Sequence, residues 1–135
     1  MYLASLSQEE KELFLGLALV LAASDGEYSD DEKTIIEGYC QEMQLSIDQE
    51  KTIMKSVDDL IGKLSVFSNE KSKRILVFEA IGLAMADGHY DKREKELITK
   101  IEKELNMETE FANKCEAVMN EYILFQGRIN ELILG

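Results

Sequence analysis

The sequence predicts an all-α protein that folds as one multihelical domain, with two internal repeats and two buried central helices surrounded by amphipathic helices. Composition, the spacing of apolar residues and a match of the chain with itself lead to this prediction. The 135 residues include no proline, no tryptophan and only 7% aromatic residues, whereas the abundant Leu, Ala, Glu and Lys favour helices over strands. A hydrophobic content of 45% suffices for one core, so we expect a single domain over residues 1–135.

The chain matches itself at a constant offset of 62 residues, from a segment that starts at Leu17 to one that starts at Glu79. Because the match runs without a gap through the loop between two predicted helices, we expect one structural unit used twice, at about residues 7–64 and 69–126. The identical pairs are Ala18/Ala80, Leu21/Leu83, Ala22/Ala84, Asp25/Asp87, Gly26/Gly88, Tyr28/Tyr90, Glu32/Glu94, Lys33/Lys95, Ile36/Ile98 and Glu42/Glu104.

Each repeat begins with a helix that is apolar on nearly all sides, predicted at residues 9–24 and 69–86. A helix of this kind requires burial on every face, so we expect these two to be the central helices. Ser7 and Glu10 have the spacing of a capping box, which supports a helix start at this point.

Amphipathic helices are predicted around the central pair, at residues 30–44, 47–64, 92–105 and 108–125, because apolar residues recur there at helical spacing. Ser46 with Gln49 and then Asn106 are the expected N-caps of the third helix of each repeat. In this region the best offset changes to 60 residues. Ile129, Leu132 and Ile133 predict a short further helix that covers the core or a partner.

The two Asp-Gly loops, residues 25–32 and 87–94, have a complete structural interpretation. Gly26 and Gly88 provide the positive φ that ends the incoming helix, and Tyr28 and Tyr90 pack at the corner. Ser29 or Asp91 then caps the outgoing helix, while Glu32 or Glu94 completes a capping box.

Metal binding is the functional alternative for these loops. In an EF-hand loop, an acid, a glycine and a final glutamate stand at positions 5, 6 and 12, and Asp25, Gly26 and Glu32 keep this spacing, as do Asp87, Gly88 and Glu94. The first two acids of an EF-hand are replaced by apolar residues, so an EF-hand is not expected. A weaker divalent site is favoured at the first loop, where five of eight residues are acidic, because Lys92, Arg93 and His89 interrupt the second.

The pattern Ala-x-Asp-Gly-x5-Glu after an apolar helix, present at residues 23–32 and as Met-Ala-Asp-Gly-x5-Glu at 85–94, resembles the TerB-like family. This family comprises the tellurite-resistance protein TerB and its relatives, including a domain of some DnaJ-type co-chaperones. The resemblance covers about residues 10–125. It implies a duplicated helical fold, a bacterial cytoplasmic setting, a role in stress response or tellurite resistance, and divalent-metal binding at Asp25, Glu32, Asp87 and Glu94.

Charge indicates the kind of partner. The net charge is −12, and residues 1–67 contribute 14 acidic against 5 basic residues, while residues 68–135 contribute 13 against 10. A nucleic acid or an anionic membrane would be repelled, so we expect a protein partner with a basic or metal-bearing surface, bound through Glu27, Asp30 and Asp31.

Catalysis is not expected, because the chain has no nucleophile elbow, phosphate-binding loop, zinc-protease motif or dinucleotide fingerprint. Cys40 and Cys115 lack metal-ligand or redox spacing and are expected in the core. No cofactor is certain, and a divalent metal ion is the only candidate. The chain has neither a leader nor an apolar stretch long enough to span a bilayer, which predicts a cytoplasmic location.

Overall fold

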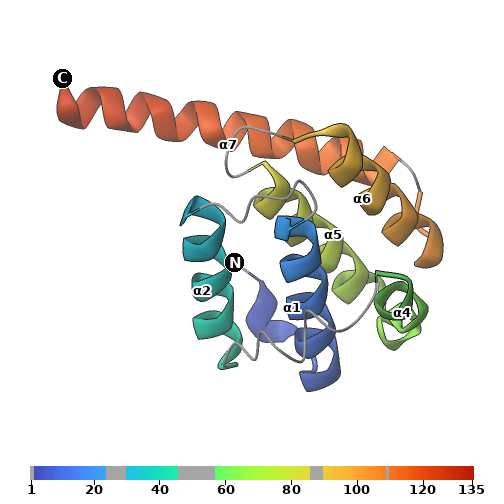
Figure 1. The fold of residues 1–135 in the computed structure, drawn as a ribbon. Helices are drawn as coiled ribbons and strands as arrows, with labels where there is room; N and C mark the ends of the chain where they lie inside the picture. Colours follow the sequence, from blue (N-terminus) through green and yellow to red (C-terminus); the bar gives the residue numbers. More distant parts are fainter. Residues whose placement is uncertain (1, 24–29, 46–56, 86–89, 109) are drawn as a thin grey trace.

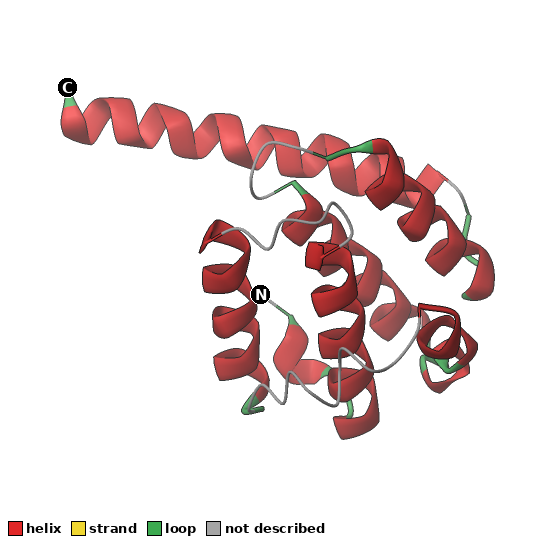
Figure 2. Cartoon of the chain, viewed as in Figure 1, coloured by secondary structure: helices red, strands yellow, loops and turns green. Residues whose placement is uncertain are grey.

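The computed structural model describes residues 2–23, 30–45, 57–85, 90–108 and 110–135, and these residues are all-helical, with no strand among them (Figures 1 and 2). The all-α, multihelical single-domain prediction is therefore confirmed. In chain order the elements are η1 (Leu3–Ser5), α1 (Gln8–Ala23), α2 (Asp30–Met43), α4 (Val57–Gly62), η2 (Leu64–Val66), α5 (Glu70–Ala84), α6 (Lys92–Glu104) and α7 (Glu110–Leu134).

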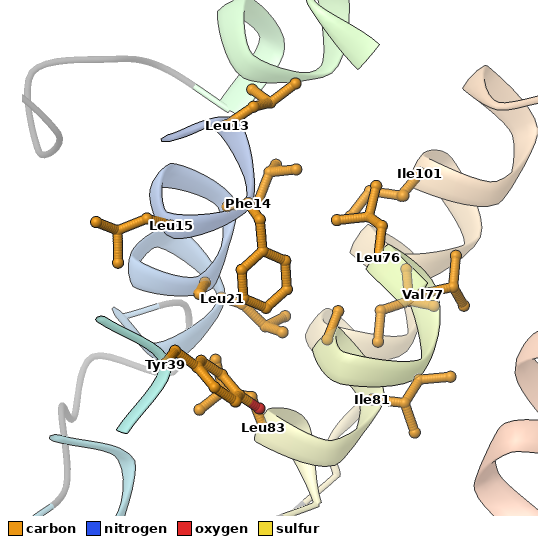
Figure 3. Close-up of a cluster of buried hydrophobic side chains, with 14 of the residues drawn as sticks. Leu13, Phe14, Leu15, Leu21, Tyr39, Leu76, Val77, Ile81, Leu83 and Ile101 are labelled. Atoms are coloured by element: carbon orange, nitrogen blue, oxygen red, sulfur yellow. The ribbon is translucent and has the colours of Figure 1, made fainter. Parts of the chain in front are cut away.

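The core forms where α1 and α5 pack against each other. α1 also contacts α2 and α4, and α5 also contacts α6 and α7. Phe14 of α1 is fully buried and meets Tyr39 of α2 edge to face, with ring centroids 5.3 Å apart. Leu76 of α5 points toward Phe14, whereas Ile81, also fully buried, lies on another side of α5 (Figure 3). The Tyr39 hydroxyl donates a hydrogen bond of 3.0 Å to the backbone carbonyl of Glu79, which joins α2 to α5 inside the core.

Two of the predicted capping boxes are confirmed. At the start of α1, the Glu10 amide donates to Ser7 Oγ at 3.2 Å and the Ser7 amide donates to Glu10 Oε1 at 2.7 Å. At the start of α6, Asp91 and Glu94 exchange the same pair of bonds at 2.9 and 3.3 Å. The predicted caps Ser29 and Ser46 lie outside the described residues.

The ends of α2 and α6 share one geometry. Gln44 and Asn106 are the only described non-glycine residues with positive φ, 57° and 55°. After each, the next amide bonds back to Cys40 or Glu102 at 2.9 Å, as in a Schellman motif. Asn106 thus ends α6, and the prediction that it caps the last helix is wrong. The two motifs are 62 residues apart, so the expected change of offset to 60 does not apply here; the repeat as a whole stays a prediction.

The segment before α1 is held by two carboxylates. Glu42 Oε2 of α2 accepts from the amides of Leu3 and Ala4, at 2.7 and 3.3 Å, and so satisfies the first amides of η1. The amide of Tyr2 donates to Glu79 Oε1 at 3.2 Å. These bonds bring the buried Leu3 side chain against the core.

The third helices differ from prediction. Residues 47–56 of the helix expected at 47–64 lie outside the described part, and the remainder forms α4 and η2. The last helix does not end near Phe125; α7 continues unbroken to Leu134 and projects beyond the other helices (Figure 1). Gly127 alone does not stop it, because one glycine costs only about 1 kcal/mol in a helix. Leu132 and Ile133 are exposed and do not cover this chain's own core.

Candidate functional site

The predicted site residues fall partly outside the described structure. Among the expected metal and interaction residues, Asp25, Glu27 and Asp87 are not described, and neither are the loop residues Gly26, Tyr28 and Gly88. The described ones are Asp30, Asp31, Glu32, Tyr90 and Glu94.

The three consecutive acids in the first turn of α2 differ in their exposure to solvent. Asp30 and Asp31 are exposed, whereas Glu32 is only 3% exposed. Lys33 lies 3.9 Å from Asp30 and is the single basic residue of α2. Asp30 and Asp31 thus belong to the surface, while Glu32 belongs to the buried interior.

The second corner is built by contacts within the chain. Glu94 is buried and its Oε1 accepts from the Asp91 amide, so this predicted metal ligand has a structural role. Tyr90 is half-buried and stacks under Lys95, whose Nζ lies 5.1 Å from the ring centroid. Burial, reinforced by nearby carboxylates of which Glu116 contributes most, raises the pKa of the Tyr90 hydroxyl well above its usual range.

Metal binding stays a prediction. Among the described residues, no three His, Cys, Asp or Glu side chains converge on a common point that would suit an ion. Because Asp25 and Asp87 are not among these residues, the expected ligand sets are described only through Glu32 and Glu94.

A buried acid and a thiol lie at the contact between α6 and α7. Glu102 is 2% exposed and its Oε2 accepts from the Ala112 amide at 3.1 Å. Burial raises the pKa of Glu102, although this hydrogen bond partly opposes the shift. Burial and the charge of Glu102 raise the pKa of Cys115 to about 11. The sequence contains a signal for this acid, since Glu102 stands four residues after Ile98, on the apolar side of its helix.

A groove of about 480 Å³ runs between α5 and α7. Its lining is mainly apolar, with Ile75 and Phe78 from α5 and Phe111 and Val118 from α7. Three exposed cations, Lys71, Arg74 and Lys114, border it. Sequence reasoning missed this groove, because the pairing of α5 with α7 is a tertiary contact that periodicity does not reveal.

The outer half of α7 presents an unusual surface. Every residue from 120 to 135 is exposed, and the large apolar side chains among them are Tyr122, Ile123, Leu124, Phe125, Ile129, Leu132, Ile133 and Leu134. An extended apolar surface of this kind marks an interaction site in a folded protein. The described helices include none that is both long and apolar enough to span a membrane.

Comparison of the chain with known protein families, with characterised proteins and with solved structures gives no match. The resemblance to TerB-like proteins therefore stays a prediction, based on the two apolar helices and the Asp-Gly motifs that follow them.

Proposed function

We propose that this protein is a non-catalytic interaction module that binds a basic partner protein through the α2 acidic face, defined as Asp30, Asp31 and Glu37. The proposal is based on the difference in exposure among the three acids at the start of α2. Glu32 is buried, whereas Asp30 and Asp31 are exposed to solvent. Glu37 is exposed on the same helix. Glu27, which the sequence analysis assigns to the same acidic surface, lies outside the described residues.

Electrostatics explains how such a face selects its partner. α2 carries several acids against the single base Lys33, and the first half of the chain holds most of the net charge of −12. A face of one sign attracts an oppositely charged protein over a Debye length of about 8 Å in physiological salt, and mainly raises the association rate. Binding should therefore weaken as salt rises.

The test uses two charge reversals of equal size. Asp30→Lys with Asp31→Lys changes the proposed face, and Asp58→Lys with Asp59→Lys changes another exposed acidic pair, in the first turn of α4. Both pairs replace acids near a helix N-terminus, so their cost to helix stability should be similar, about 0.3–1 kcal/mol per charge.

Partners captured from the cells that express this protein would be identified by mass spectrometry and their affinities measured with purified components. We expect the α2 reversal to weaken binding at least tenfold and the α4 reversal to leave it nearly unchanged. Circular dichroism of both variants checks that they fold. Equal loss in the two variants, or binding that is indifferent to salt and to both changes, would falsify the proposal.

The alternative is a divalent-cation sensor at the first Asp-Gly loop, favoured by the five acids among residues 25–32. NMR titration with calcium, magnesium, manganese and zinc would distinguish it. Shifts of the Gly26 amide at sub-millimolar ion would support it, and unchanged Gly26 and Gly88 amides at millimolar ion would remove it.

A further inference from the structure

We infer that α7 is a dimerisation helix: the outer half of α7 from one copy lies antiparallel in the groove between α5 and α7 of a second copy. This inference is independent of the α2 acidic face, because no residue of that face belongs to α5 or α7. It rests on the exposed apolar surface of α7, the groove, the spacing of their residues and the charges beside them.

The exposed surface is concentrated on one element. Of the large apolar side chains that are exposed in the described structure, all except Tyr2 belong to α7. Leu132 is 84% exposed and Phe125 is 59% exposed. Burying such side chains yields about 25 cal/mol for each Å² of apolar surface removed from water. The outer half of α7 therefore gains stability from any apolar surface that covers it.

One apolar seam joins the groove to the exposed half. It starts at residues that line the groove and continues into solvent with alternating steps of four and three residues: Phe111, Cys115, Val118, Tyr122, Phe125, Ile129 and Leu132. This is the heptad spacing that packs two helices side by side, with each side chain set between those of the facing helix. At about 1.5 Å per residue the seam is roughly 32 Å long.

Only an antiparallel arrangement uses both halves of the seam. In a parallel pair the two exposed halves would meet each other and both grooves would stay open. In the antiparallel register, Tyr122 packs against the partner's Phe125, and Val118 against the partner's Ile129. Cys115, at the floor of the groove, then receives the partner's Leu132.

Charges beside the seam fit the same register. Glu121 and Arg128 are exposed and seven residues apart, so they flank the seam on one side. The antiparallel register sets Glu121 opposite the partner's Arg128, and by symmetry this pair forms twice. A parallel coiled coil would instead place Glu121 beside the partner's Gln126. The only charged residues of the exposed half that border the seam are therefore complementary in the antiparallel dimer.

A second copy fits this surface better than a membrane does. A protein with a net charge of −12 is repelled by anionic lipid headgroups, and a bilayer would leave the matching groove empty. The seam repeats on both copies, so a single two-fold axis closes the assembly and covers the exposed part of the seam on each copy.

The first experiment measures molar mass by sedimentation equilibrium at micromolar concentrations, where we expect about twice the monomer mass of 15.4 kDa. Phe125→Asp should give a monomer, because it sets a charge in the seam. Leu124→Asp is the matched control: Leu124 is 64% exposed on the same helix but points away from the seam, and this variant should remain dimeric. Both residues lie outside the core, and circular dichroism verifies folding.

The second experiment tests the register by charge exchange. Glu121→Arg and Arg128→Glu should each weaken the dimer at least fivefold, because each puts like charges opposite one another twice. The double exchange should restore the affinity of the natural chain.

The inference is overturned if the natural chain is monomeric at these concentrations. This includes the case in which the monomer binds neutral lipid vesicles or a different protein through α7. Equal disruption by Phe125→Asp and Leu124→Asp also overturns it, and so does a double exchange without rescue. Failure of the α2 reversals would leave these masses unchanged, so the two proposals fail separately.

Discussion

The carboxylate of Glu102 accepts a hydrogen bond from the backbone amide of Ala112, 3.1 Å away, in the buried contact between α6 and α7. Ala112 is the third residue of α7, where an amide has no partner within its own helix. A side chain from the last turns of α6 thereby caps the helix that follows it. The start of α7 is fixed by α6, although its far end extends into solvent.

We expect Glu102→Ala to destabilise the protein by about 1–3 kcal/mol, because the buried Ala112 amide loses its acceptor. Glu102→Gln keeps an oxygen acceptor of similar size and should cost less. Urea denaturation at neutral pH measures both changes. Equal costs for the two variants would contradict a stabilising hydrogen bond from the Ala112 amide.

The pKa of Glu102 also predicts a pH dependence. Burial raises this pKa in the folded protein, so the folded state binds the proton more tightly than the unfolded chain does. The resulting stabilisation is present below the unfolded pKa and is lost as pH rises through the folded pKa. The natural chain should therefore lose more stability than Glu102→Gln between pH 4 and pH 7. Denaturation of both proteins across this range checks the sign, and a difference that does not change with pH contradicts it.

Cys115 should react slowly with iodoacetamide while the protein is folded. Its pKa is raised to about 11, so roughly one thiol in a thousand is the reactive thiolate at pH 8. Mass spectrometry should show modification that accelerates steeply with pH and upon unfolding. Fast labelling of the folded protein at pH 7 would contradict the buried position of this thiol.

Removing one cap at the start of α6 should have a defined cost. Asp91→Ala removes the acceptor for the Glu94 amide and should destabilise the protein by about 1 kcal/mol. Asp91→Asn is the control, because asparagine caps helices about as well as aspartate. Thermal unfolding of the natural protein and both variants measures these changes. A similar loss of stability in both variants would show that the charge of Asp91, and not its capping bond, stabilises the helix.

Gly127→Ala should stabilise α7 by up to about 1 kcal/mol, since alanine is the better helix former and nothing lies within 4 Å of the added methyl group. Gly82→Ala in α5 is the comparison. Its methyl group would lie 3.2 Å from Met119 Cε, so the cost of displacing that side chain offsets part of the gain in helix stability. Circular dichroism and denaturation should rank Gly127→Ala as the more stable variant.

Local sequence signals predicted much of the helical structure. The helix expected at residues 30–44 is α2 at Asp30–Met43, and the helix expected at 92–105 is α6 at Lys92–Glu104. These boundaries were predictable because apolar spacing and capping residues act within a few positions of one another. The capping box of Asp91 and Glu94 was predictable for the same reason.

Two kinds of feature were not predictable: those in which one residue type can take either of two structural roles, and those that depend on contacts between residues far apart in the sequence. Asparagine serves both as an N-cap and in the left-handed conformation after a helix, and only the bonds back to α6 decide the role of Asn106. The helix expected at 108–125 and the short helix expected around Ile129 are one continuous helix, α7, because no proline interrupts the chain between them. The bond of Glu102 to Ala112 and the groove beside Cys115 arise from tertiary packing, which no local pattern encodes.

Residues 120–134 of α7 are helical yet wholly exposed. An isolated helix of about 12–15 residues is only marginally stable in water. This segment is not isolated, because it continues a helix whose first turns pack against α5 and α6. In the proposed dimer it gains a covering surface as well. If the dimer forms, the helix content of residues 120–134 should rise with protein concentration, because dimerisation stabilises this part of α7.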